Sequence, residues 1–86
     1  MRFQISRHAE EQMARRQIPR NWLTPLLENP QQRLWQEAGV AVLQSRFASE
    51  DGRIYLLRAV VAVAKEPALV VTVYRRTKIE KYWRPE

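Results

Sequence analysis

The chain from Val40 to Ala64 reads VAVLQSRFASEDGRIYLLRAVVAVA, and this stretch decides the fold. Two apolar, β-branched runs flank residues 49–52, a group of turn formers that ends in glycine. The pattern predicts antiparallel strands over 40–48 and 53–64, joined as a hairpin. Further strands are expected over 33–36 and 69–76, with a turn at 38–39 and a loop at 65–68.

The N-terminal third has a helical period after a short strand. Residues 2–5 alternate between polar and apolar, and Ser6 then suits the N-cap of a helix over 7–16. A second helix is expected over 20–27. Its apolar face consists of Trp22, Leu23, Leu26 and Leu27. Pro25 lies inside this helix and is expected to bend it or disturb its first turn.

These elements predict an α+β fold within a single domain spanning residues 1–86. A short N-terminal strand and two helices are expected to pack on one face of a four-stranded antiparallel sheet. The tail after residue 76 has no assigned element.

The composition is strongly basic. The net charge is +6, and arginine supplies twelve of the fifteen cations. Because the planar guanidinium matches phosphate with two parallel hydrogen bonds, this bias favours a nucleic-acid partner over simple solubility. Many small basic proteins bind no nucleic acid, so a solvated basic surface is the alternative.

Several classes of protein are disfavoured. The chain has no cysteine and one histidine, which excludes disulfides and argues against a structural zinc site. No glycine-rich phosphate loop is present, so no cofactor and no metal are expected. No leader and no apolar run of about 20 residues is found, so we expect a cytoplasmic protein without a membrane partner.

Strand alternation divides the sheet into two faces. The apolar set expected beneath the helices includes Leu57, Ala59, Val61, Val71 and Val73. The opposite, open face is expected to present Gln44, Arg46, Arg58, Thr72, Tyr74 and Arg76. Such a face suits phosphate recognition, although an ordinary solvated sheet face is also polar.

His8 is the first candidate for proton-transfer chemistry, because it alone ordinarily titrates near neutral pH. A lone histidine is also common as a surface or packing residue. Metal-free RNA cleavage needs a base, a cation and a proton donor. His8, Arg58 and Tyr74 meet that need, with Thr72 as an orienting hydroxyl. Further phosphate contacts are expected from Arg46, Arg75, Arg76, Lys78 and Lys81.

The opening run Ile5-Ser6-Arg7-His8-Ala9, followed by Met13, Arg16, Ile18 and Asn29-Pro30, resembles a bacterial domain family of unknown function. Its members open with I-x-x-H-A-x-x-x-M-x-x-R-x-I, and the V-T-V-Y strand at 71–74 is also similar. That family resembles the barnase–EndoU–colicin–RelE group of ribonuclease-like toxin folds. The resemblance carries over His8, Thr72 and Tyr74 as site residues. Arg58 enters only by its place on the open face.

The resulting hypothesis is a ribonuclease-like, toxin-type domain that acts on or binds RNA without metal. Its partners would be RNA and an antitoxin-type protein. The alternative is a non-catalytic module on the same scaffold that binds nucleic acid or another protein.

Overall fold

The computed structural model describes residues 2–85 of the chain. Its elements in chain order are β1 (Phe3–Ile5), α1 (Arg7–Arg15), α2 (Arg20–Glu28), β2 (Gln32–Glu37), β3 (Val40–Ala48), β4 (Ile54–Ala62), β5 (Ala68–Arg76) and α3 (Ile79–Tyr82). The α+β class is confirmed, and the predicted helices and strands end within two residues of the observed ones. The short helix α3 is an addition to the predicted fold.

The sheet has five strands in the order β1-β5-β4-β3-β2, so the prediction of a four-stranded antiparallel sheet is wrong. β1 pairs in parallel with β5, while the other pairs are antiparallel. The physical reason is that the outer edge of β5 needs hydrogen-bond partners. The Ala68 amide donates to the Arg2 carbonyl, and the Ser6 amide donates to the Val70 carbonyl, each at 3.0 Å.

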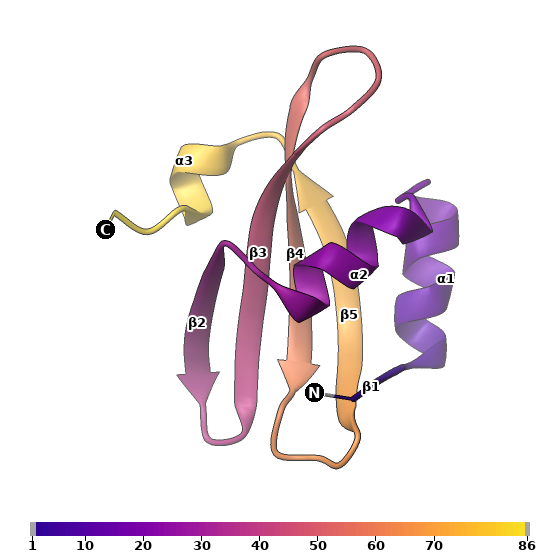
Figure 1. The fold of residues 1–86 in the computed structure, drawn as a ribbon, viewed down its shortest axis with the longest axis vertical. Helices are drawn as coiled ribbons and strands as arrows, with labels where there is room; N and C mark the ends of the chain where they lie inside the picture. Colours follow the sequence, from indigo (N-terminus) through magenta and orange to yellow (C-terminus); the bar gives the residue numbers. More distant parts are fainter. Residues whose placement is uncertain (1, 86) are drawn as a thin grey trace.

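Helix α2 covers the front of the sheet in Figure 1. Its predicted apolar face is confirmed, because Leu23, Leu26 and Leu27 are buried in the core. The Trp22 ring stacks on the Phe47 ring of β3, with centroids 5.2 Å apart. The helix continues through Pro25 to Glu28, so this proline does not end it.

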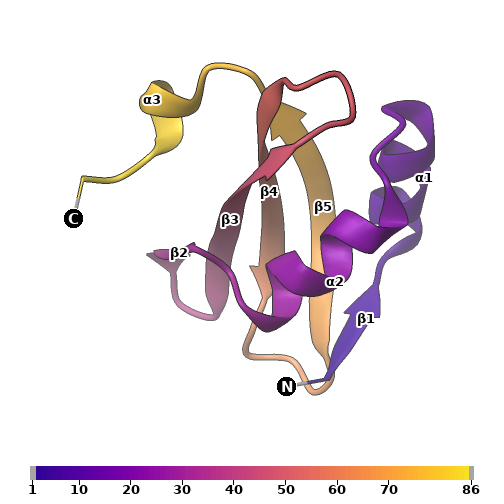
Figure 2. The same cartoon turned by 45° about the horizontal axis from the view of Figure 1, so that its top comes forward.

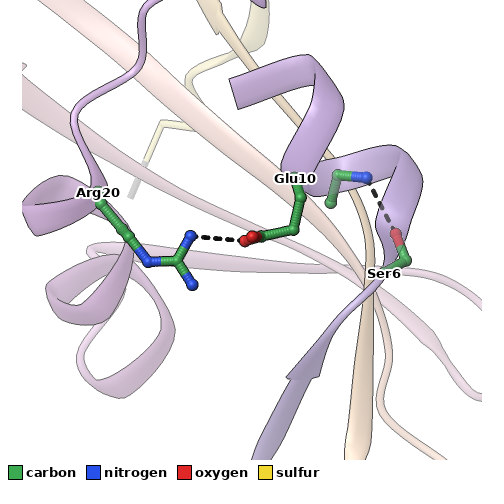
Figure 3. Close-up of polar contacts among 4 residues, drawn as sticks. Ser6, Glu10 and Arg20 are labelled. Atoms are coloured by element: carbon green, nitrogen blue, oxygen red, sulfur yellow. Dashed lines mark hydrogen bonds and ion pairs between the residues drawn. The ribbon is translucent and has the colours of Figure 1, made fainter. Parts of the chain in front are cut away.

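Helix α1 lies beside β5, where β1 ends (Figures 1 and 2). The predicted cap is confirmed, since the Ser6 hydroxyl accepts a 3.0 Å hydrogen bond from the Ala9 amide. Figure 3 shows this cap and the ion pair at 2.6 Å between Glu10 and Arg20, which joins α1 to α2. Ala9 and Met13 are the buried residues of α1.

A β-bulge in β5 changes the predicted faces of this strand. Val60 and Val61 of β4 pair with Thr72 and Val70, which leaves Val71 as the extra residue. Val70 is fully buried with the core, whereas Val71 is 39% exposed. The assignment of Val71 to the core is therefore wrong, because the bulge reverses the alternation N-terminal to Thr72.

The sheet face opposite α1 and α2, called the far face below, is not open as predicted. Residues 77–85, called the C-terminal segment, lie away from α1 and α2 (Figure 2) and bond to the far face. Leu56 of β4 is fully buried there, and Arg58 is 8% exposed. The C-terminal segment therefore makes a third, partial layer.

Candidate nucleic-acid interface

Four polar side chains form a continuous row across the far face. Gln32, Gln44, Arg58 and Tyr74 come from β2, β3, β4 and β5, and each lies directly opposite the next. Gln44 Nε2 donates to Gln32 Oε1 at 2.6 Å, and Arg58 Nε donates to Gln44 Oε1 at 3.0 Å. Arg58 Nη1 donates to the Tyr74 hydroxyl at 2.8 Å. We call this row the polar ladder.

The polar ladder binds the C-terminal segment through that segment's backbone. Gln32 Nε2 donates to the Arg84 carbonyl at 2.7 Å, and the Arg84 amide donates back to Gln32 Oε1 at 3.1 Å. Gln44 Nε2 also donates to the Tyr82 carbonyl at 3.2 Å. Among residues 2–85, every buried side-chain nitrogen or oxygen has a partner. The network therefore holds the segment in one register without leaving a polar group unsatisfied.

The charge of Arg58 has no carboxylate partner within residues 2–85. Buried arginines are normally paired, because desolvating a charge is costly. The ion pairs in this part of the chain join Arg7 to Glu11 and Arg20 to Glu10, away from the far face. The Arg58 guanidinium instead lies over the Tyr82 ring at 4.5 Å and the Tyr74 ring at 5.6 Å. Cation–π contacts with these rings partly replace its hydration.

A second arginine joins the same aromatic pair. The Arg76 guanidinium lies 4.4 Å from the centre of the Tyr74 ring, and its Nε donates to the Tyr82 hydroxyl at 3.4 Å. This hydrogen bond is the main reason that the pKa of the Tyr82 phenol lies below its ordinary value. Arg58, Arg76, Tyr74 and Tyr82 are called the Arg–Tyr cluster below. It combines two cations with two hydroxyls and contains no acid.

The other basic residues that were predicted to contact phosphate lie on several different surfaces of the protein. Arg46 is exposed, and its guanidinium lies 4.3 Å from the Trp83 ring centre, on the far face. Lys78 and Lys81 are exposed on the C-terminal segment. Arg75 lies over the Tyr55 ring at 4.8 Å. Because Arg75 pairs with the core residue Leu57, it belongs to the helix side of the sheet and not to this face.

Of the predicted catalytic residues, Arg58 and Tyr74 are in direct contact, and His8 is bonded to neither. His8 is exposed on α1, one helical turn before Gln12 and on the same stripe of the helix. Gln12 Oε1 accepts from the Thr72 hydroxyl and, at 3.2 Å, from the Val73 amide. His8 therefore belongs to the part of α1 that borders β5, whereas Thr72 and Tyr74 share the far face.

The candidate interface also includes Gln32, Tyr82 and Trp83, which were not identified as site residues from the sequence. The adjacent aromatic residues Tyr82 and Trp83, set among Lys78, Lys81 and Arg84, are a usable signal for such a surface. Gln32 carries no comparable signal, because its role depends on pairing with Gln44 across two strands.

The described residues 2–85 contain no cluster of three or more side chains of the kind that could hold a metal ion. Within the same range, no helix is both long enough and apolar enough to cross a bilayer.

The fold and this interface define a small α+β domain with a basic, aromatic sheet face. Residues 5–75 match the family described as "Domain of unknown function (DUF4258)", and the chain belongs to this family. The match ends at Arg75, so Arg76 and the C-terminal segment lie outside it. Searches of curated proteins and of solved structures found no significant match.

Proposed function

We propose that this protein binds RNA, without metal, through the far face of its sheet. The observation that carries the proposal is the Arg–Tyr cluster. There Arg58 and Arg76 surround Tyr74 and Tyr82 without a carboxylate among the described residues. A cytoplasmic location, where RNA is available, is part of the proposal.

The chemistry of the cluster suits phosphate. A phosphate oxygen accepts hydrogen bonds from guanidinium and hydroxyl groups, and arginine binds it with two parallel bonds. Arg46, Lys78 and Lys81 add exposed cations around the cluster. Each phosphate that is neutralised releases counterions, which makes affinity depend on salt.

The test is the fluorescence anisotropy of a labelled single-stranded RNA, titrated with protein over a range of salt concentrations. Arg76→Gln should weaken binding about 5-fold at 0.1 M salt and lower the salt slope by about 0.7, as expected for one lost phosphate contact. Arg33→Gln is the matched control, because Arg33 is exposed and pairs with the core residue Leu43 on the other face. Equal losses in both variants, or no RNA binding at low salt, would contradict the proposal.

A second candidate function is metal-independent RNA cleavage by a toxin-type domain, which an antitoxin-type protein would restrain. The specific observation in its favour is the edge of β5. His8 and Gln12 share one stripe of α1, and Gln12 contacts Thr72, whose side chain shares the far face with Tyr74. Strand β5 thus supplies two hydroxyls, from Thr72 and Tyr74. The neighbouring elements α1 and β4 supply a general base, His8, and a guanidinium, Arg58.

In this reaction the RNA 2′-oxygen forms a bond to phosphorus and the bond from phosphorus to the 5′-oxygen breaks. His8 takes the proton of the 2′-hydroxyl, and Tyr74 gives a proton to the departing 5′-oxygen. Arg58 is 8% exposed and positions the Tyr74 hydroxyl, while Arg76, which lies over the same ring, stabilises the charge on the phosphorus-bound oxygens. Because Arg58 donates to the Tyr74 oxygen, the Tyr74 proton remains available for donation.

Incubation of purified protein with labelled RNA and a chelator tests cleavage. The expected products end in a 2′,3′-cyclic phosphate, and His8→Ala should slow their formation at least 100-fold while leaving RNA affinity unchanged. On expression in bacteria, wild type should arrest growth and His8→Ala should not. Cleavage that persists in His8→Ala would remove this candidate.

A further inference from the structure

The C-terminal segment forms a groove beside the Arg–Tyr cluster. The groove is about 630 Å³ in volume and is lined mainly by apolar atoms. Its lining residues are Arg46, Ile54, Ile79, Glu80, Trp83 and Pro85. This volume falls within the range of about 300–1,000 Å³ that is common for small-molecule sites.

The register of the strands places this groove next to the proposed phosphate contacts. Arg46, Leu56 and Arg76 are direct neighbours across β3, β4 and β5, one row beyond the polar ladder. Ile54 lies two residues before Leu56 on the same face of β4. Two neighbouring strands are about 4.8 Å apart, so Arg46 and Arg76 are separated by roughly 10 Å at the backbone. A nucleic-acid backbone bound along this row would therefore pass the mouth of the groove.

We propose that this groove binds an unpaired nucleobase, which makes the protein selective for single-stranded nucleic acid. The inference rests on the proposed function, because the cluster supplies the phosphate contacts and the groove supplies the base contact. It assigns a specific role to the part of the chain that lies outside the family match.

The chemistry of the lining favours a base over a phosphate. Bases stack on aromatic rings and on arginine guanidinium planes, and the groove offers Trp83 and Arg46 for this contact. Ile54, which is 49% exposed, supplies further apolar surface. The carboxylate of Glu80 repels phosphate but accepts hydrogen bonds from the amino and imino groups of bases.

A second cavity lies on the helix side of the sheet and has more acidic side chains. It has a volume of about 550 Å³, and its lining includes Glu50 and Asp51 together with Arg75, Trp22 and Tyr55. Its two carboxylates disfavour a polyanion at that position. Both cavities therefore offer aromatic rings and a guanidinium, and the far-face groove suits a nucleic acid better because it has one carboxylate instead of two and lies near Arg76.

Base pairing decides the class of ligand. In a duplex the bases are stacked and paired, so a groove of this kind receives a base only from a single strand, a loop or an end. Stacking alone is tolerant of sequence and does not use the 2′-hydroxyl. We therefore expect single-stranded RNA and single-stranded DNA to bind with similar affinity at the groove.

The experiment compares three labelled 12-residue probes of one sequence by anisotropy: single-stranded RNA, single-stranded DNA and duplex RNA. Wild type should bind both single strands at least 10-fold more tightly than the duplex. Trp83→Leu should reduce this preference about 10-fold, the size of one lost base stack, and Trp83→Phe should retain most of it. Trp35→Leu is the matched control, because Trp35 is 68% exposed on β2 and does not line the groove.

Ile54→Gln is the second variant, because loss of Trp83 removes the contact with Arg46 and can loosen the C-terminal segment. Ile54 makes no such contact, and its replacement should reduce the single-strand preference about 3-fold at an unchanged melting temperature. Equal affinity of wild type for duplex and single strands would overturn the inference while leaving the proposed function intact. Failure of all three probes to bind at low salt would overturn both.

Discussion

At the scale of single residues, the end of α1 shows how one backbone conformation sets the path of the chain. Gln17 has a φ of 54°, in the left-handed region that favours glycine. The Ile18 amide donates to the Met13 carbonyl at 2.9 Å, and the Gln17 amide donates to the Ala14 carbonyl at 3.3 Å. These two bonds form a Schellman motif, and its characteristic apolar contact joins Ile18 to Met13 in the core.

Gln17→Gly should therefore stabilise the protein. Relief of the left-handed strain is worth about 1 kcal/mol, and the greater freedom of glycine in the unfolded chain offsets part of it. We expect a net gain of about 0.5 kcal/mol in the free energy of unfolding, measured by urea denaturation. The exposed helical residue Ala14 is the control, because Ala14→Gly should destabilise by about 0.5–1 kcal/mol.

Tyr82 gives a second prediction at this scale. Its folded-state pKa lies below the ordinary value of 10.0, chiefly because Arg76 donates a hydrogen bond to the phenol oxygen. The resulting stabilisation is complete above the unfolded-state pKa and is lost as the pH falls through the folded-state pKa. An ultraviolet pH titration should show a phenolate step below pH 10.0 in wild type. This step should disappear in Tyr82→Phe, and its persistence there would assign it to another tyrosine.

At the scale of elements, the position of α1 depends on the half-buried side-chain amide of Gln12 more than on its exposed ion pair. Gln12 extends to the edge of β5 and accepts hydrogen bonds from Thr72 and Val73. Gln12 thereby supplies a hydrogen-bond acceptor for the Val73 amide at the edge of β5, beyond the point where β1 ends. The ion pair between Glu10 and Arg20 is largely exposed and screened by solvent (Figure 3).

Gln12→Ala should accordingly cost about 1–3 kcal/mol in the free energy of unfolding, since it leaves the Val73 amide and the Thr72 hydroxyl without their partner. Glu10→Ala should cost less than about 1 kcal/mol. Urea denaturation of both variants makes the comparison, and amide exchange at Val73 should be faster only in Gln12→Ala. Equal losses would mean that the ion pair and the amide hold α1 equally.

At the scale of the whole molecule, the far face is closed by a segment that comes last in the chain. Leu56 is fully buried there, between Arg46 and Arg76, whose side chains contact Trp83 and Tyr82 of this segment. The polar ladder forms hydrogen bonds with the backbone of Tyr82 and Arg84. The packing of the C-terminal segment on the sheet therefore depends on its alignment with the polar ladder as well as on apolar burial. The same segment supplies two aromatic rings to the proposed binding surface.

A chain that ends at Thr77 should fold with lower stability. It exposes Leu56 and removes the Arg84 backbone groups that bond to Gln32, which should lower the free energy of unfolding by at least about 2 kcal/mol. The urea midpoint measures this loss. The double variant Lys78→Ala, Lys81→Ala is the control, because it removes two charges and retains the segment. An unchanged midpoint in the shortened chain would show that the segment does not stabilise the sheet.

The local elements follow from neighbouring residues, which is why they were predictable. Ser6 caps α1 through a residue three positions away, and the face of α2 repeats within two helical turns. The hairpin between β3 and β4 joins adjacent strands through a turn of a few residues. The placement of Gln44, Arg58, Tyr74 and Arg76 together on one face also follows from strand alternation, because no bulge intervenes between them.

What the sequence by itself determined is therefore the α+β class, the positions of the main elements and a sheet face that gathers arginine, tyrosine and glutamine. Only the tertiary structure decided the parallel pairing of β1 with β5, the bulge at Val71 and the burial of Arg58 beneath the C-terminal segment. These features join residues that are distant in the chain, such as Ser6 with Val70 and Gln32 with Arg84. These features stabilise the protein because they give hydrogen-bond partners to strand edges and to buried polar groups. Such groups are withdrawn from water, and so need protein partners, only once the sheet has assembled.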